Sequence, residues 1–268
     1  MIDLNYAPFF LLALLGAIVA NSTGAGGGIV FVPAFKLLGI DHASIIATSF
    51  AIQCFGMSAG SLAWWRYSRK QNTKIEPAWR EYGNLVRLFA LPTIIGVVFG
   101  QTVFQPSNEQ QTIIVFKLFS VIFAIAILVT TYQLRKTIAT GLSLGEVRSI
   151  KNNRLMRTLF YLTGFVGGAI TAWLSIGVGE LVAILLILLR YPVALSVGVA
   201  VSVSAIAVWM GVQKYIWFSN GINLDILVFA GPAALIGGTL ARRLASYLSP
   251  IQLKIVIAGW VMASAIVM

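Results

Sequence analysis

The chain has 268 residues, of which 59% are hydrophobic and only 10% are charged. A soluble domain of this size does not need so much apolar surface, and long apolar stretches recur from end to end. The composition therefore predicts an all-α, polytopic integral membrane protein. The net charge of +11 does not indicate a nucleic-acid partner. The Lys and Arg residues gather in the short polar links between apolar stretches, where they set membrane topology.

Ten apolar segments follow one another along the chain, and most reach the roughly 20 residues that a helix needs to cross a bilayer. They cover residues 6–20, 29–38, 43–65, 85–104, 113–134, 159–174, 181–189, 193–215, 224–241 and 251–268. The second and the seventh are short, because ten residues of helix rise only about 15 Å. The first two segments therefore form either a re-entrant hairpin or two tilted spans, and the sixth and seventh do likewise. Between eight and ten membrane segments are expected.

The basic residues predict which links face the cytoplasm. With 66–84 and 135–158 on the cytoplasmic side, all of the 19 Lys and Arg residues except Lys36, Lys117 and Lys214 lie on that side or close to it. Such a bias is typical of cytoplasmic loops. We therefore expect a multi-pass protein of the cell inner (plasma) membrane with both termini outside the cytoplasm.

Polar, helix-breaking backbone separates the first two apolar segments, in the stretch Asn21-Ser22-Thr23-Gly24-Ala25-Gly26-Gly27-Gly28. Unwound backbone is tolerated at membrane depth only inside protein or beside a water-filled cavity. The helix that follows directs free N–H groups and the positive end of its dipole into this gap, which suits a small anion. Small residues also serve close helix packing, but packing does not require polar neighbours. We expect the following residues to bind substrate: Asn21, Ser22, Thr23, Gly24, Gly26, Gly27 and Gly28.

A second copy of the pattern precedes the seventh segment, in the stretch Ser175-Ile176-Gly177-Val178-Gly179-Glu180. Further matches follow in order along the chain: Ala43 and Ala47 with Ala194 and Gly198, Phe89-Ala90-x-Pro92 with Phe229-Ala230-x-Pro232, and Lys117 with Lys254. Each half holds five segments, an odd number, so the two copies must be inverted relative to each other, as in many transporters. We expect a first repeat at 1–134, a basic cytoplasmic linker at 135–157 and a second repeat at 158–268.

Polar side chains near the two motifs are expected to complete the site. Ser49 and Gln53 share one helix face, Trp173 precedes the second motif, and Ser175, Gly177 and Gly179 lie within it. Hydroxyls and amides are suitable donors to an oxyanion, although such groups also link helices without binding a ligand.

Glu180 is the acidic residue embedded in an apolar segment. Burying an ionisable group in a membrane is costly and indicates a function. Because a carboxylate repels an anion, we interpret Glu180 as a site for proton or cation coupling. The alternative is a carboxylate that is favoured by its helix N-terminus and faces a water-filled vestibule.

These motifs resemble the sulfite exporter TauE/SafE family of membrane proteins. The resemblance covers nearly the whole chain and is carried by Gly24-x-Gly26-Gly27-Gly28 with Pro33, by Ala43…Ala47-Thr48-Ser49, and by Gly177-x-Gly179 with Ala194…Gly198. It implies export of small sulfur oxyanions or organosulfonates, such as sulfite or sulfoacetate. The chain departs from the family pattern at Glu180 and Leu181, where the second motif usually has more glycine.

We therefore expect a secondary transporter that exports a small anion by alternating access around a midplane site. An anion channel or uniporter is the alternative. An intramembrane enzyme would need converging catalytic groups, which one His, one Cys and one buried Glu do not supply. No P-loop is present, so an ion gradient, the membrane potential or the substrate's own gradient would drive transport. We expect no cofactor and no metal, and the expected partners are the anion, the bilayer and a coupling proton or cation.

Overall fold

The computed structural model describes residues 4–72, 77–103, 109–139, 154–219, 221–247 and 259. All regular elements in these residues are helical, which confirms the all-α prediction. The α-helices are α1 (Pro8–Thr23), α2 (Gly28–Leu37), α3 (His42–Asn72), α4 (Tyr82–Thr102), α5 (Glu109–Ala139), α6 (Arg154–Leu174), α7 (Val178–Leu188), α8 (Val193–Lys214) and α9 (Leu224–Tyr247). Shorter helical turns cover Leu4–Tyr6, Pro77–Glu81 and Tyr215–Ser219. The tenth apolar segment, apart from residue 259, and most of the expected linker lie outside the described residues.

Five helical stretches of the described chain are long and apolar enough to cross a membrane. They are Ser44–Gln71, Ala78–Thr102, Arg154–Leu174, Val193–Ser219 and Leu224–Ala245. Shorter apolar helices lie at Pro8–Thr23, Gly28–Leu37, Gln110–Ala126 and Val178–Leu188. The protein is therefore an integral, multi-pass membrane protein.

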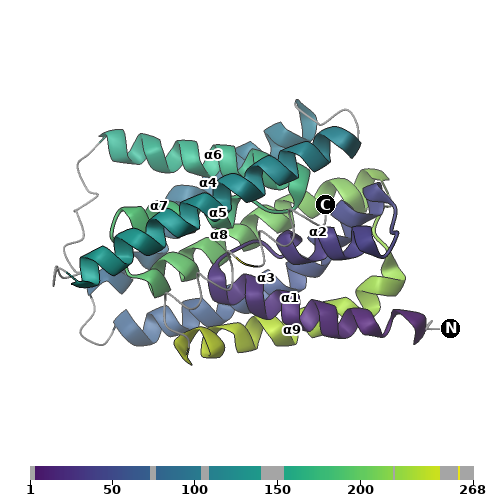
Figure 1. Cartoon of the computed structure of the whole chain (residues 1–268), viewed down its shortest axis with the longest axis horizontal. Coiled ribbons are helices and arrows are strands. Elements are labelled where there is room, and N and C mark those ends of the chain that lie inside the picture. The colour runs from purple at the N-terminus through teal and green to yellow at the C-terminus, as the bar shows by residue number, and fades with distance from the viewer. Residues whose placement is uncertain are drawn as a thin grey trace.

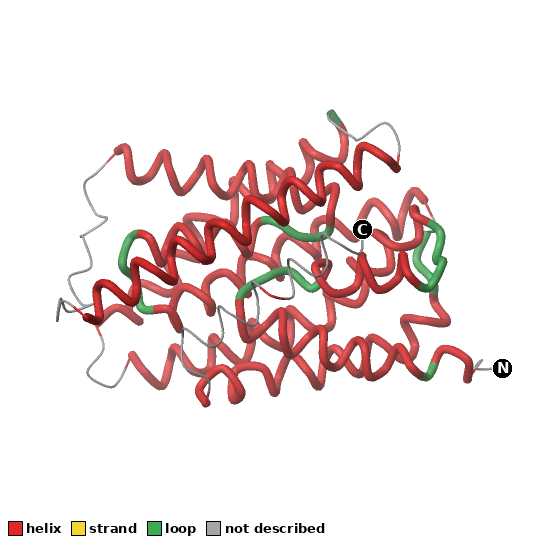
Figure 2. Tube along the Cα trace, in the orientation of Figure 1, coloured by secondary structure: helices red, strands yellow, loops and turns green. Residues whose placement is uncertain are grey.

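The two short helices each return toward the end of the molecule from which the preceding helix came (Figure 1). In this view α1 runs from the right-hand end to the middle and α2 returns to the right, whereas α6 starts at the left-hand end and α7 returns to the left. Each pair is thus a hairpin. The loop between the two helices of each hairpin lies near the middle of the long axis of the molecule (Figure 2).

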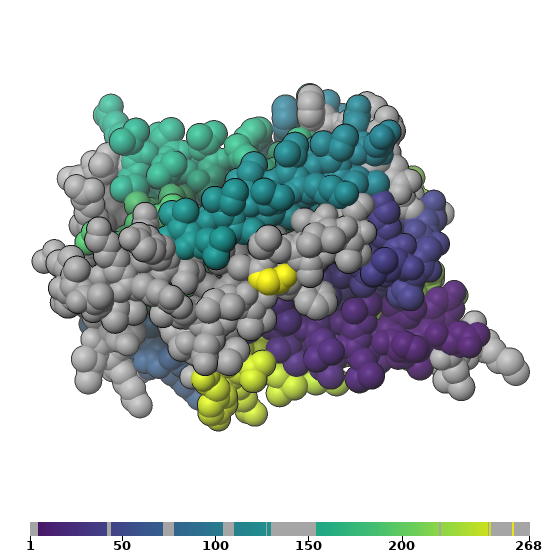
Figure 3. Space-filling view, in the orientation of Figure 1, coloured from purple at the N-terminus to yellow at the C-terminus, as the bar shows by residue number. Residues whose placement is uncertain are grey.

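The core of the bundle is formed by α3 and α8, which pack against each other and hold α2 and α7. In the most apolar 18-residue stretches of these two helices, 78% and 72% of the residues are buried. In the corresponding stretches of the other three long helices, 33 to 44% are buried. At the periphery, α5 crosses one face of the molecule (Figure 3) and turns apolar side chains such as Leu118 and Ile122 outward. An apolar outer surface of this kind is suited to contact with lipid.

Small residues allow the outer helices to approach each other at backbone distance. A Cβ on Gly96 of α4 would overlap the carbonyl oxygen of Phe165 on α6, and a Cβ on Gly237 of α9 would lie 2.5 Å from that of Leu14 on α1. Inside a bilayer, lipid is as apolar as the helix surfaces, so close packing of this kind is a main source of helix association.

Candidate functional site

The first helix break begins at Gly24, which ends α1 in the left-handed conformation at φ 81°. Glycine adopts this conformation without steric cost and is therefore the usual residue at such helix ends. The Gly24 N–H donates to the Ala20 carbonyl oxygen at 3.0 Å, and the Ala25 N–H donates to the Thr23 hydroxyl at 3.1 Å. Helix α2 starts at Gly28, so residues 25–27 are left without helical structure.

The second break follows Leu174, the last residue of α6. Ser175 has φ 59° and Gly177 has φ 141°. Positive φ is uncommon for a residue with a side chain and is tolerated where surrounding contacts hold it. At the start of α7, the Val178 N–H donates to the Thr171 hydroxyl at 2.9 Å. Both glycine-containing stretches therefore interrupt a helix, as expected from the sequence.

The two breaks touch each other directly. A Cβ on Gly28 would lie 2.5 Å from the Ser175 carbonyl oxygen, and one on Gly26 would lie 3.2 Å from the Ile176 Cα. The absence of side chains at 26 and 28 therefore lets two segments 150 residues apart pack backbone to backbone. We call this contact region, with Gln53 and Glu180, the break centre.

The carboxyl group of Glu180 joins the two halves of the break centre. Its Oε1 accepts a hydrogen bond from the Gly26 N–H at 2.7 Å, and its Oε2 accepts one from the Gly177 N–H at 2.9 Å. The bond to Gly177 is the helix-capping half of a capping box, because Glu180 is the third residue of α7. The bond to Gly26 goes beyond capping, since it crosses to the other half of the chain. Glu180 is 0% exposed, so it does not face a water-filled vestibule in this conformation.

The side-chain amide of Gln53 on α3 makes the second link. Its Oε1 accepts from the Gly27 N–H at 2.7 Å, while its Nε2 donates to the Ser175 carbonyl and hydroxyl oxygens at 3.0 and 2.7 Å. The same Nε2 donates to the Ser49 hydroxyl at 3.1 Å, and the Ser49 and Ser175 hydroxyls are 3.0 Å apart. The predicted pair Ser49 and Gln53 thus lies at the contact between the breaks.

The other expected site residues on α1 and α6 make different contacts. Polar side-chain groups of Asn21, Ser22 and Thr23 donate to carbonyl oxygens of α1 itself, at 2.8 to 3.1 Å. The indole N–H of Trp173 donates to the Gly100 carbonyl oxygen on α4 at 2.9 Å.

Gly179 makes a further contact between the two halves. A Cβ on Gly179 would overlap both the Gly24 carbonyl oxygen and the hydroxyl of Ser204 on α8. The Ser204 hydroxyl is buried and has no hydrogen-bond partner among the described residues. The sequence alone did not indicate a site role for Thr171, because isolated hydroxyls in apolar helices are common.

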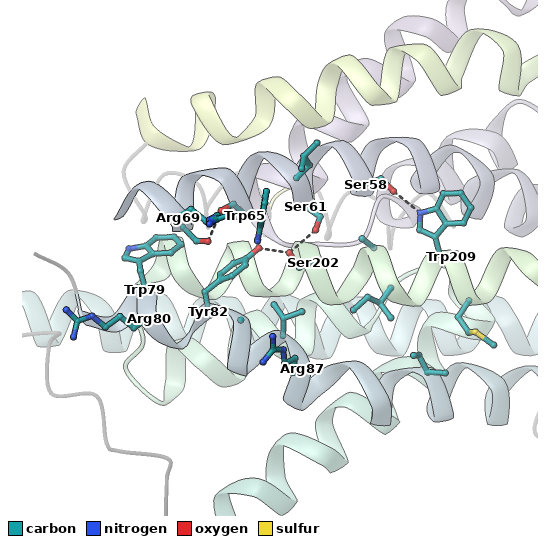
Figure 4. A pocket seen from close by; sticks show the side chains of 18 of the residues that line it. Ser58, Ser61, Trp65, Arg69, Trp79, Arg80, Tyr82, Arg87, Ser202 and Trp209 are labelled. Atoms are coloured by element: carbon teal, nitrogen blue, oxygen red, sulfur yellow. Dashed lines mark hydrogen bonds between the residues drawn. The ribbon is translucent and has the colours of Figure 1, made fainter. Parts of the chain in front are cut away.

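A cavity of about 1060 Å³ opens between α3, the turn Pro77–Glu81, α4 and α8 (Figure 4). Its lining includes three arginines, Arg69, Arg80 and Arg87. Further in, the Ser202 hydroxyl lies 2.6 Å from the Tyr82 hydroxyl and accepts a hydrogen bond from the Ser61 hydroxyl at 3.0 Å. None of the residues of the break centre lines this cavity, so the centre is closed off from it.

Comparison with protein families decides the class of the protein. The family model described as Sulfite exporter TauE/SafE matches residues 9–268. The chain belongs to the sulfite exporter TauE/SafE family. No curated protein and no solved structure that was compared with the chain matches it.

Membership of the TauE/SafE family confirms the resemblance seen in the sequence and supports a role in membrane transport. The family match does not point to single residues. What the structure adds is the contact between the breaks, in which Gly26, Gly27 and Gly177 offer backbone N–H groups to side chains. From the sequence, the arginines of the cavity were interpreted mainly as topology signals and secondarily as a source of attraction for anions.

Proposed function

We propose that this TauE/SafE protein is a secondary transporter that exports a small anion, a sulfur oxyanion or an organosulfonate, by alternating access around the break centre. The observation that carries the proposal is the convergence of two helix breaks in the middle of the molecule, each with backbone N–H groups directed to the contact. Helix N-termini of this kind bind anionic groups near the membrane midplane in other transporters.

Two inverted repeats, at 1–134 and 158–268 and joined by the linker at 135–157, are part of the proposal. If α1 to α4 correspond to α6 to α9, the packing of α1 on α9 and of α4 on α6 is one contact made twice. In the same scheme α3 and α8 pack on each other as equivalent helices. This pattern supports a two-fold relation between the halves, and the basic end of the bundle is proposed to face the cytoplasm of the inner membrane.

Glu180 is proposed to couple transport to protons because its carboxylate takes the place that an anion would need. It accepts the N–H groups of Gly26 and Gly177, which are the donors that two converging breaks offer. A substrate anion competes for these donors and is repelled by the carboxylate charge. Substrate binding therefore requires Glu180 to move away or to take up a proton, and departure of the proton restores the original contact.

The arginine-lined cavity is proposed as the access route from the cytoplasm. Arg69, Arg80 and Arg87 raise the local concentration of anions. Trp64 is buried between this cavity and the first break: its ring stacks on Trp79 of the cavity wall, and its indole N–H donates to the Asn21 carbonyl oxygen at 3.0 Å. Movement of this ring would connect the cavity with the break centre.

The proposal is tested by anion flux in proteoliposomes under imposed pH and sodium gradients. Sulfite and short organosulfonates are expected to cross the membrane at rates typical of carriers, and the flux is expected to depend on the pH gradient. Absence of flux for every small anion under all gradients would refute the transporter proposal. Single-channel currents would show that the protein is an anion channel and not a carrier.

A further inference from the structure

A second, smaller cavity lies between α3 and α9, and it collects positive charge from both helices. It has a volume of about 350 Å³ and a lining without a carboxylate among the described residues. Its basic residues are Arg66, Lys70, Arg242 and Arg243. The lining shares only Leu62 with the larger cavity, so this is a separate site on another face of α3.

The fold brings these cations together through the close contact of α3 and α9. A Cβ on Gly238 of α9 would overlap the carbonyl oxygen of Gly56 on α3, so the two backbones touch on the apolar side of the cavity. Arg66 and Lys70 follow on one face of α3, one turn apart. Arg242 and Arg243 bring two further cations from α9 to the same cavity.

One of the four cations is held in place over an aromatic ring. The guanidinium carbon of Arg242 lies 4.7 Å from the ring centroid of Tyr67, and the side chain is half-buried. Such a cation–π contact positions the charge without neutralising it. Membrane topology accounts for the number of basic residues at this end, but it does not require four of them to surround one cavity. Cationic side chains gathered around one cavity attract an anionic group.

The surroundings of the cavity favour a lipid over a free anion. Leu62, Leu240 and Leu244 are exposed beside it, at 44%, 41% and 43%. Basic pockets between membrane helices, next to apolar surface, bind the headgroups of anionic lipids. We propose that this cavity binds the phosphate headgroup of an anionic phospholipid, whose acyl chains lie along the exposed leucines. The site is independent of the transport function proposed above.

The test compares retention of phosphatidylglycerol, cardiolipin and phosphatidylcholine by the purified full chain, measured by native mass spectrometry. Wild-type protein is expected to retain the two anionic lipids and not phosphatidylcholine. Each basic residue near a membrane surface contributes about 1 kcal/mol to such binding, so R242Q/R243Q and R66Q/K70Q are each expected to weaken retention about 30-fold. R154Q/R157Q removes the same charge from exposed positions at the start of α6 and is expected to retain lipid like wild type. R242K/R243K, which keeps the charge, is expected to retain most of the binding.

Photoactivatable phosphatidylglycerol gives a readout on the wild-type chain alone, so the proposal does not depend on folding of the variants. Labelling is expected in peptides that cover 59–70 and 239–243. Labelling elsewhere, or equal weakening by the control R154Q/R157Q, would overturn the proposal. It would also be overturned if inorganic phosphate or sulfite in detergent displaced bound lipid completely at millimolar concentration, since the site would then bind free anions.

Discussion

The two helix breaks are alike in backbone and different in chemistry. The first is rich in glycine, and its Gly26 and Gly27 N–H groups donate to side chains from other elements. The second has fewer glycines. Its Gly177 N–H donates to its own Glu180, and its Ser175 carbonyl oxygen and Glu180 carboxyl group act as acceptors for groups of the first half. The Gly26 N–H is thus paired with Glu180 from the second half of the chain. The Gly27 N–H is paired with Gln53, whose side chain also contacts Ser175 of the second half. Separating the breaks leaves buried polar groups unpaired, so the contact must be exchanged for a substrate or for water.

The largest effect is expected from Gly28→Ala, which forces the breaks apart. The new Cβ would lie 2.5 Å from the Ser175 carbonyl oxygen, which belongs to backbone and cannot rotate away. We expect transport to be lost and the free energy of unfolding to fall by about 1–3 kcal/mol. Gly56→Ala is the control, because its nearest neighbours lie at 3.4 Å and the helix gains intrinsic stability. Anion flux and thermal unfolding are measured for both variants. Equal behaviour of the two would show that the breaks do not need close contact.

Glu180→Gln tests whether the asymmetry between the breaks serves coupling. The amide keeps one acceptor oxygen but places an NH₂ group against one of the two backbone N–H donors. An unpaired buried donor costs about 1–3 kcal/mol, so we expect at least tenfold slower export. The dependence of flux on an imposed pH gradient should also disappear. Full transport with an unchanged pH dependence would rule out the coupling role.

Gln53→Leu removes the side chain that joins the breaks from α3. It leaves the Gly27 N–H and the Ser175 carbonyl oxygen without their side-chain partner, at about 1–3 kcal/mol for each buried group. We expect a lower unfolding temperature and a several-fold loss of flux. Gln110→Leu, at an exposed position of α5, serves as the control. If both variants behave alike, the Gln53 amide does not hold the centre.

The smallest effect is expected from Arg87→Gln in the arginine-lined cavity. Removing one of the three arginines weakens attraction of the anion without touching the break centre, so KM should rise about threefold with kcat unchanged. Arg154→Gln, exposed at the start of α6, should leave KM unchanged. The rise should shrink at high ionic strength because salt screens exposed charges. A fall in kcat alone would place Arg87 outside the access route.

The sequence predicted the positions of both breaks because clustered glycines and polar residues disfavour a continuous helix inside an apolar segment. It also placed Ser49 and Gln53 on one helix face. The pairing of Glu180 with Gly26 was out of reach, since the sequence does not specify which backbone a buried carboxylate meets across 154 residues. Asn21 shows a second limit: its side-chain amide nitrogen donates to the Ala17 carbonyl oxygen of its own helix, a local bond that the sequence did not specify.

The packing of the short helices could not be predicted from the sequence for a similar reason. A helix of ten residues, such as α2, fits a re-entrant hairpin or a tilted span by length, and its length does not specify that it packs against α3. The arginines of the two cavities illustrate the same point, because a count of charges gives the side of the membrane and not the cavity that each side chain lines.

Cross-linking the two breaks tests the central claim, that they must separate during transport. A Cβ at position 26 lies 3.2 Å from the Ile176 Cα, within reach of a disulfide. Gly26→Cys and Ile176→Cys are introduced together in a Cys54→Ala background, which removes the one native cysteine. Anion flux of this variant is measured before oxidation, after oxidation and after reduction, and its reduced form, expected to be slower than wild type because the Cβ at position 26 crowds the contact, is the reference. We predict that oxidation stops flux and that reduction restores it. Undiminished flux with the disulfide fully formed would contradict the account.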